Sequence, residues 1–168
     1  MTDGLSCTCL MPLAWHPASL DENARRSLMR EATHLLAALN QMENSHELEV
    51  GGPENRRLER LEAKLDLALH LLARTLEPGP AAEGRAVTLT PQGAEWMDAT
   101  PPADSDELIL EIRPSEQLPL TLKLPAVAYA PLSGKARVRF ENLPEALDDA
   151  LHQFVFRRHR QAIRLRAL

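Results

Sequence analysis

The sequence has too few cysteines for a disulfide framework and too few aromatic residues for an aromatic-rich core. Its 168 residues include two cysteines, Cys7 and Cys9, and aromatic side chains make up 4% of the chain. Small secreted domains depend on several disulfides, so this composition indicates a reducing compartment, and we expect a cytoplasmic protein. A chain of this length can bury a sizeable core, which must then consist mainly of leucine, valine and alanine.

The sequence has neither a net positive charge nor a long hydrophobic run. Its formal net charge is −5 at pH 7, and the only lysines are Lys64, Lys123 and Lys135. An acidic chain has no general attraction to nucleic acid or to an anionic membrane, so we expect neither as a partner. No charged segment precedes the apolar residues 10–15, and no apolar stretch has the length of a membrane span, so we expect no signal peptide and no membrane insertion.

The residue combinations of a catalytic or metal site are also lacking. Cys7, Cys9 and His16 supply three metal ligands at most, whereas a structural zinc site requires four. Asp66 and His70 are four residues apart, but no nucleophile or oxyanion donor accompanies them, so a pair on a helix surface is favoured. The sequence has no glycine-rich phosphate loop either, and we predict a noncatalytic protein without a metal or a cofactor.

Two segments of the N-terminal half have the hydrophobic spacing of coiled-coil helices. Ser19 and Glu22 are spaced as in a capping box, which predicts that the first helix begins near residue 19. The second is expected over residues 54–76, between a Gly51-Gly52-Pro53 break and the Pro/Gly-rich residues 77–84. The apolar positions that recur at three and four residues are Leu28, Ala32, Leu35, Leu39, Met42, Leu58, Leu61, Leu65, Ala68 and Leu72.

The second helix is apolar around most of its circumference. Leu67, Leu69 and Leu71 widen its apolar surface, so that only one narrow polar stripe remains. A helix that contacts one neighbour needs one apolar face, so this helix must be covered on more than one side. Association of subunits covers it most simply, and we assign residues 18–76 to oligomerisation.

Beyond residue 85 the hydrophobic period changes from about 3.6 residues to two, which indicates β-strands. Alternating segments with irregular turns between them predict a small antiparallel barrel over residues 85–142, with a loop at 101–106. Pro119 and Pro125 are expected at strand edges or ends, because proline cannot donate to a β-ladder.

Residues 143–168 predict a last helix with a strongly basic end. Arginine side chains near a helix C-terminus interact favourably with the helix dipole, so a solvated helix end is the favoured interpretation. The alternative is a binding surface for an anionic partner that includes Arg157, Arg158 and Arg160.

The order of these segments resembles the PilZ domain family. The resemblance rests on VTLTPQGAEW, ELILEI, LPLTLKLP and GKARVRF, followed by ENLPEALDDALHQFVFRRHR. The opening CTCLMPLAWHP and the two heptad-patterned helices look like the atypical, tetramer-forming branch of that family. The resemblance implies one α+β domain over residues 1–168, with a six-stranded antiparallel barrel, two long N-terminal helices and a C-terminal helix. Residues 1–17 are expected to be an extended segment ahead of the helices.

Most members of that family are receptors for the bacterial second messenger cyclic di-GMP, which they bind through an RxxxR motif and a [DN]xSxxG motif. The second motif falls on residues 88–93, where Thr90 supplies the hydroxyl group and Gly93 the glycine. Thr88 stands where Asp or Asn is usual, and a threonine cannot present their carboxylate or amide acceptor to guanine. Arg85 has no arginine four residues before it. These four residues are the candidate nucleotide contacts, and we expect weak binding or none.

The resemblance implies a signalling or adaptor protein of the cyclic di-GMP network that self-associates through a helix bundle. A tetramer is favoured over a dimer, and the partner is expected to be a protein. The alternative is a helical oligomerisation scaffold whose protein-binding barrel is unrelated to cyclic di-GMP.

Overall fold

The protein forms an antiparallel barrel with three helices. The computed structural model describes residues 4–44, 53–75, 83–115 and 120–166. The α+β fold, with six strands, two long helices in the N-terminal half and a C-terminal helix, is confirmed. The elements are β1 (Cys7–Pro17), α1 (Glu22–Asn44), α2 (Pro53–Thr75), β2 (Glu83–Thr90), β3 (Gly93–Met97), β4 (Glu107–Ile112), β5 (Leu122–Ala128), β6 (Lys135–Arg139) and α3 (Glu145–Arg166).

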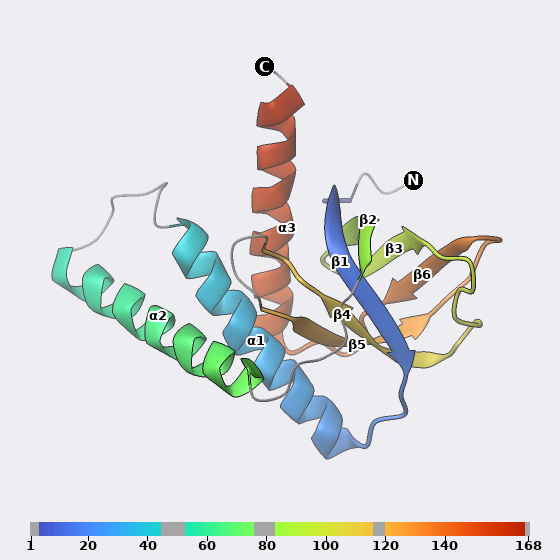
Figure 1. Ribbon diagram of the computed structural model, residues 1–168, viewed down its shortest axis with the longest axis horizontal. Coiled ribbons are helices and arrows are strands. Elements are labelled where there is room, and N and C mark those ends of the chain that lie inside the picture. Colours follow the sequence, from blue (N-terminus) through green and yellow to red (C-terminus); the bar gives the residue numbers. More distant parts are fainter. Residues whose placement is uncertain (1–3, 45–52, 76–82, 116–119, 167–168) are drawn as a thin grey trace.

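The N-terminal strand closes the barrel. The strand order is β1-β2-β3-β6-β5-β4, and β1 pairs with β2 on one side and with β4 on the other (Figure 1). Residues 7–17 are therefore barrel wall, and the expectation that the barrel is confined to residues 85–142 is wrong. Leu10 points outward and is 72% exposed, so the alternation of β1 is broken by an apolar residue on its outer face.

Pro125 lies inside β5 and not at its end. It pairs with Ile109 of β4, whereas β5 pairs with β6 only through Val127 and Ala128. At Pro125 the side of β5 that faces away from β4 has no strand partner. A proline, which has no N–H group, is tolerated at such a local edge without the loss of a ladder hydrogen bond. Pro119 and residue 118 of the expected strand lie outside the described residues.

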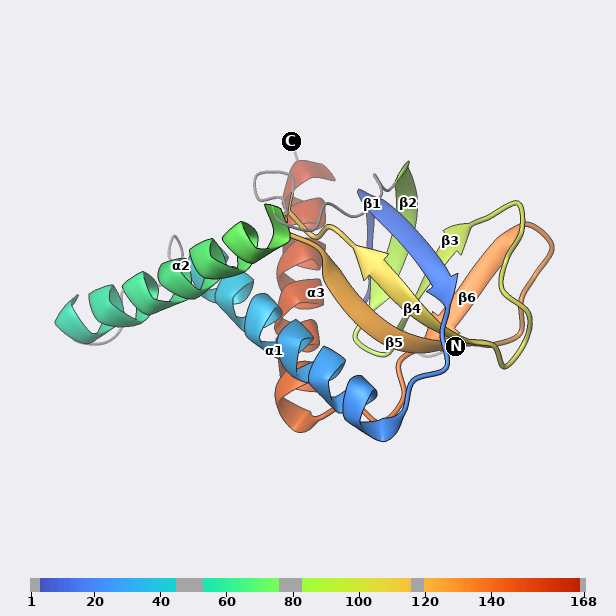
Figure 2. The ribbon, with the colours of Figure 1, turned by 60° about the horizontal axis from the view of Figure 1, so that its bottom comes forward.

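α3 and α1 pack against the barrel, and α2 packs against α1. Figures 1 and 2 show α1 running past α3 and the barrel, with α2 outermost, and α1 contacts α3, β5 and α2. None of the helices in the described ranges is long and apolar enough to cross a membrane. The core is rich in leucine and valine, and its buried members include Val87, Leu89, Trp96, Leu108, Leu110, Ile112, Leu122, Leu124, Val138, Leu147, Leu151, Phe154 and Val155.

α1 begins at Glu22, three residues later than expected. Asp21 caps it, since Asp21 Oδ1 accepts a hydrogen bond of 2.7 Å from the backbone N–H of Ala24. An acidic side chain at this position satisfies a backbone donor that has no partner within the helix. α2 begins at Pro53, where proline fits the first helical turn.

Candidate nucleotide site and oligomerisation surface

Thr88 lies on the outer face of β2, where the strand register sets its neighbours. It is opposite Thr8 of β1 and Glu95 of β3. The hydroxyl oxygens of Thr8 and Thr88 are hydrogen-bonded at 3.0 Å. Thr88 therefore serves the β1–β2 pairing and presents no carboxylate or amide to a guanine edge.

Thr90 and Gly93 form the turn that joins β2 to β3. Thr90 Oγ1 donates to the carbonyl oxygen of Gly93 at 3.2 Å and accepts from the backbone N–H of Gln92 at 3.3 Å. Gly93 lies against β6, where an added Cβ would be 2.2 Å from the carbonyl oxygen of Val138. The hydroxyl and the glycine of the motif therefore have structural roles that need no ligand.

Replacing Gly93 with alanine should destabilise the barrel. The new Cβ would meet backbone atoms of β6, which can move only if the strand shifts. We expect a loss of about 1–3 kcal/mol in the free energy of unfolding, measured by urea denaturation. Gly84→Ala is the matched control, because nothing lies within 4 Å of its added Cβ. An equal loss in the two variants would contradict the close-approach explanation.

Arg85 is bound by a buried carboxylate. Arg85 Nη1 donates to Asp98 Oδ2 at 3.0 Å, and the side chain of Asp98 is 8% exposed. The same oxygen accepts the indole N–H groups of Trp15 at 2.8 Å and Trp96 at 3.0 Å. Asp98 Oδ1 accepts the backbone N–H of Thr100 at 3.0 Å. This Asp98 network joins β1, β2 and β3. It also engages the guanidinium group of Arg85, the arginine nearest the nucleotide motif.

The network keeps Asp98 ionised. Burial raises the pKa of this carboxyl, but the hydrogen bonds from Trp15, Trp96 and the Thr100 backbone and the charge of Arg85 together lower it by more. The net result is a pKa below the usual aspartate value. The sequence pattern missed Asp98, and the only available signal was the pair of tryptophans, because a buried indole N–H requires an acceptor.

The outer face of β3 and β6 carries paired charges beside the motif. Arg137 Nε donates to Glu95 Oε1 at 3.0 Å, and Lys135 pairs with the other oxygen of Glu95. The Arg137 guanidinium also lies 4.7 Å from the centroid of the Tyr129 ring. These cations are already matched to a carboxylate, so the surface offers less to a phosphate than its basic residues suggest.

Arg157 and Arg158 turn inward and hold α3 to α1. Arg157 is 7% exposed, and it donates to Asn40 Oδ1 at 2.6 Å and pairs with Glu43 Oε2 at 2.8 Å. Arg158 pairs with Glu43 Oε1 at 3.4 Å and donates to the carbonyl oxygen of Pro114. The favoured interpretation of a solvated helix end is therefore wrong for Arg157, and the alternative of an anion-binding surface is not met either, because Arg157 and Arg158 are both paired with Glu43. Arg160 is exposed and stacks on Phe156, with 5.8 Å between its guanidinium carbon and the ring centroid.

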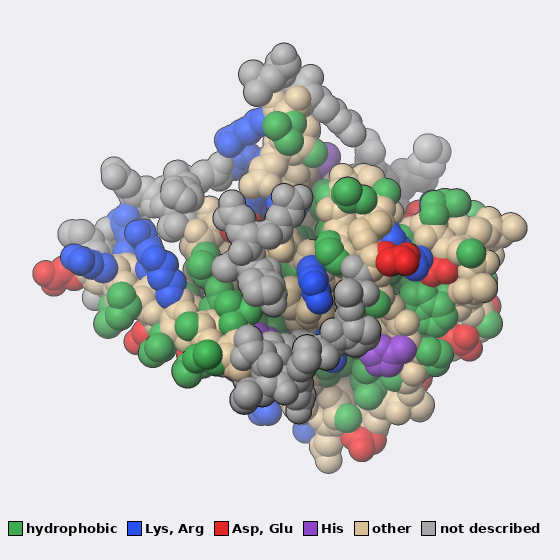
Figure 3. Space-filling model, viewed as in Figure 1, with side chains coloured by type: hydrophobic (Ala, Val, Ile, Leu, Met, Phe, Trp, Pro, Cys, Tyr) green, Lys and Arg blue, Asp and Glu red, His purple; other side chains and the backbone are tan. Residues whose placement is uncertain are grey.

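α2 has two opposite apolar faces. One face, with Ala63 and Leu67, is buried. The other is an exposed leucine row, and Figure 3 shows hydrophobic side chains along this helix. At 100° per residue the row occupies a single stripe of the helix, and Ala68, also exposed, lies beside it. Its members, each 57–64% exposed, are Leu58, Leu61, Leu65, Leu69 and Leu72.

The apolar positions of α1 face this chain's own core. Ala32, Leu35 and Leu39 are each at most 5% exposed, while Leu28 and Met42 are partly buried. The expectation that these three buried residues face another subunit is not met, because α1 has α2, α3 and β5 as neighbours within the chain. Heptad spacing identifies an apolar face but does not identify what covers it.

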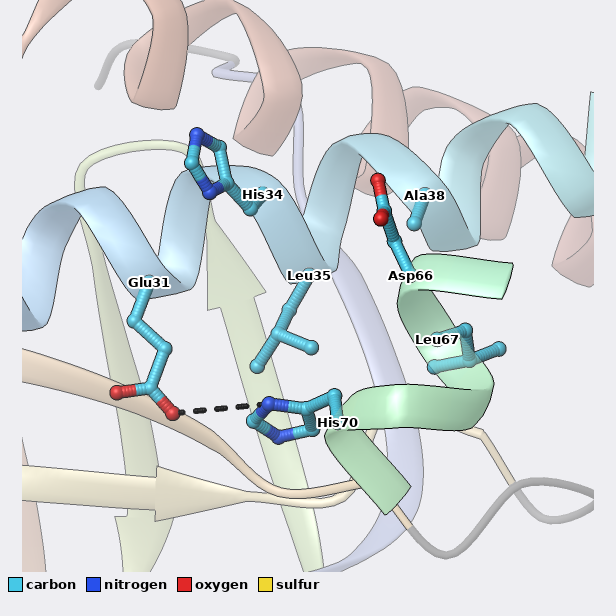
Figure 4. A pocket seen from close by; sticks show the side chains of 7 residues that line it. All are labelled: Glu31, His34, Leu35, Ala38, Asp66, Leu67 and His70. Atoms are coloured by element: carbon cyan, nitrogen blue, oxygen red, sulfur yellow. Dashed lines mark ion pairs between the residues drawn. The ribbon is translucent and has the colours of Figure 1, made fainter. Parts of the chain in front are cut away.

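A groove of about 410 Å³ separates α1 from α2 (Figure 4). His70 Nδ1 lies 3.9 Å from Glu31 Oε1 of α1 across it, so this histidine contacts the neighbouring helix, and Asp66 lines the same groove. The lining includes no serine, threonine or cysteine nucleophile. Within the described ranges, no group of three His, Cys, Asp or Glu side chains could hold a metal ion.

Comparison with known proteins identifies the family. The family model of the atypical PilZ domain, a cyclic di-GMP receptor, matches residues 34–166. A solved structure of a pathogenic protein from Xanthomonas campestris, a tetrameric PilZ domain self-assembled through a helical bundle, is 28% identical, with a TM-score of 0.73 over 97% of this chain and 92% of that chain. No curated protein matches. Because the match extends from within α1 through β2–β6 to α3 and covers more than half of the chain, the chain belongs to the atypical PilZ domain family.

Proposed function

We propose that this protein is a noncatalytic adaptor of the cyclic di-GMP network, which assembles through α2 and binds a protein with its barrel. One observation carries the proposal: all four candidate nucleotide contacts are engaged within the barrel. Arg85 is held by Asp98, Thr88 bonds to Thr8, Thr90 closes a turn and Gly93 lies against β6. A nucleotide would have to displace the contacts of the Arg85, Thr88 and Thr90 side chains, which adds to the cost of binding.

Self-association follows from the exposed leucine row. Each leucine is about 60% exposed, and covering it stabilises an assembly by about 1–2 kcal/mol. Five such side chains on one stripe are more than a stable monomer usually exposes together. The tetrameric helical bundle of the related Xanthomonas campestris protein supports a tetramer here over a dimer.

An assembly of this kind would present several barrels at once. Linked binding sites raise the effective concentration for a clustered or repeated partner, so weak contacts by each barrel suffice. The paired charges of Glu95, Lys135 and Arg137 beside Tyr129 give each barrel a polar, partly aromatic surface suited to a protein partner. Cys7 and Cys9 are both free, which suits the reducing cytoplasm.

Calorimetric titration with cyclic di-GMP should give weak binding or none. The Thr88→Asn variant restores an amide for guanine but not the missing arginine arm, so it should not reach submicromolar affinity either. A submicromolar dissociation constant for the unmodified protein would contradict the proposed loss of nucleotide binding. If the set of bound protein partners stayed the same when the cellular cyclic di-GMP concentration changed, the result would instead favour a scaffold outside this signalling network.

A further inference from the structure

We propose that the charged sides of α2 pair between copies of this chain, with the basic side of one α2 along the acidic side of the next. The inference rests on the proposed self-association through α2, and it names the contacts that direct this association. Between residues 57 and 66 the charged side chains are sorted by sign on the two sides of the exposed leucine row. At 100° per residue, the acidic flank on one side and the basic flank on the other consist, respectively, of Glu59, Glu62 and Asp66, and of Arg57, Arg60 and Lys64.

The charges of the two flanks are not matched within the protomer. All six side chains are exposed, and among the described residues no ion pair of the protomer includes any of them. Charges four residues apart have the same sign, as in Glu62 with Asp66 and in Arg60 with Lys64. Like charges at this spacing destabilise an isolated helix, so an oppositely charged partner would offset a cost that the protomer carries alone.

The acidic flank faces the groove between α1 and α2. Glu59, Glu62 and Asp66 line a hollow of about 280 Å³ that adjoins the groove of Figure 4, and Asp66 lines both. None of the described residues that line these two hollows is a lysine or an arginine. The carboxylates are therefore open to long cationic side chains from outside the protomer.

A second copy of this chain provides those cations. Figure 3 shows Lys and Arg side chains beside the hydrophobic side chains of α2, so a copy that covers the leucine row also brings its basic flank to the contact. With Leu58 at position a of a heptad, Arg57 falls at g and Glu62 at e, where opposite charges pair between helices. If the two α2 helices ran in opposite directions, each flank would meet its own kind, and like charges would face each other. Opposite flanks meet when the helices run in the same direction.

The test reverses one flank at a time in the full-length protein and measures assembly by sedimentation equilibrium at low salt. Arg57→Glu/Arg60→Glu makes both flanks mainly acidic, and Glu59→Lys/Glu62→Lys makes both mainly basic. Each variant alone should need about tenfold more protein than the unmodified chain for half-assembly, because like charges then face each other. A 1:1 mixture of the two variants should assemble again, since each supplies the flank that the other has lost.

The two variants carry their own control for helix stability. The carboxylate placed at position 60 lies four residues from Lys64, and the cation placed at position 62 lies four residues from Asp66. Each reversal therefore adds an opposite-charge pair within α2, so loss of the helix would not explain dissociation. Circular dichroism checks the fold of each variant. A single neutral substitution such as Lys64→Gln removes one exposed ion pair and should keep the full mass.

Salt provides a second measurement, with opposite signs in the unmodified chain and in the variants. Raising sodium chloride from about 0.05 to 0.3 M screens attraction in the former and repulsion in the latter, so assembly should weaken in the former and strengthen in the latter. Unchanged assembly in both variants, or stronger assembly of the unmodified chain at high salt, would overturn the flank pairing and leave association through the leucine row standing. A monomeric unmodified chain would overturn both.

Discussion

Replacing Leu65 with glutamate should break the assembly into smaller species. Leu65 lies in the middle of the exposed leucine row and is 59% exposed in the protomer, so the substitution leaves the protomer's own core intact. In a bundle the same position would become buried, and an unpaired carboxylate there would cost several kcal/mol. The expected result is a later elution and a lower mass by size-exclusion chromatography with light scattering.

Lys64→Gln is the matched control for that variant. Lys64 is an exposed neighbour of Leu65 that lies off the row, and its substitution changes the charge by the same amount and sign. It should assemble as the unmodified chain does. If Leu65→Glu kept the full mass, or if both variants dissociated equally, the exposed leucine row would not be the interface.

Replacing Asp98 with alanine should produce the largest loss of barrel stability. It leaves two indole N–H groups and the Arg85 guanidinium without their shared acceptor. Removing one partner of a buried charged pair typically costs about 3–5 kcal/mol. Urea denaturation followed by tryptophan fluorescence measures this directly, because Trp15 and Trp96 are the only tryptophans and both contact Asp98.

Asp104→Ala provides the control, since this exposed carboxylate accepts one backbone hydrogen bond, from Ala130 at 2.8 Å. We expect it to cost about 1 kcal/mol or less. If Asp98→Ala cost no more than this control, the Asp98 network would not be a main support of the barrel.

The Asp98 network also predicts a pH dependence. The pKa of Asp98 is lowered in the folded protein. The ionised carboxylate therefore contributes fully to the free energy of unfolding above the pKa of aspartate in the unfolded chain, about 3.9, and this contribution is lost as the pH falls through the folded pKa. The free energy of unfolding should therefore decrease on acidification in that window. The decrease should be smaller in Asp98→Asn, and an identical slope in the two proteins would contradict this assignment.

Local pattern was enough to predict the elements in which one face is buried. Buried residues alternate along β4, β6 and the second half of β2 because each strand has an inner and an outer face, and α2 shows its two apolar faces in its leucines. β1 was missed as a barrel strand because exposed Leu10 disturbs the alternation. Periodicity reports which side of an element is apolar, so it could not show that α1 packs on β5 and α3.

The candidate site was predicted less completely, because its decisive contacts are long-range. The Asp98 network joins residues 15, 85, 96 and 98, and no spacing rule connects these positions. The inward turn of Arg157 toward Asn40, 117 residues away, is equally invisible in a basic helix end. The motif substitution at Thr88 was visible in the sequence, but only the structure showed that Arg85, Thr90 and Gly93 are also engaged.

Sedimentation equilibrium on the unmodified chain, across micromolar concentrations, tests the central claim most directly. The exposed leucine row predicts a mass well above that of the 18.7 kDa protomer, with a tetramer as the expected species. A single monomeric species over that whole range would contradict self-association through α2 and the multivalent adaptor role that depends on it.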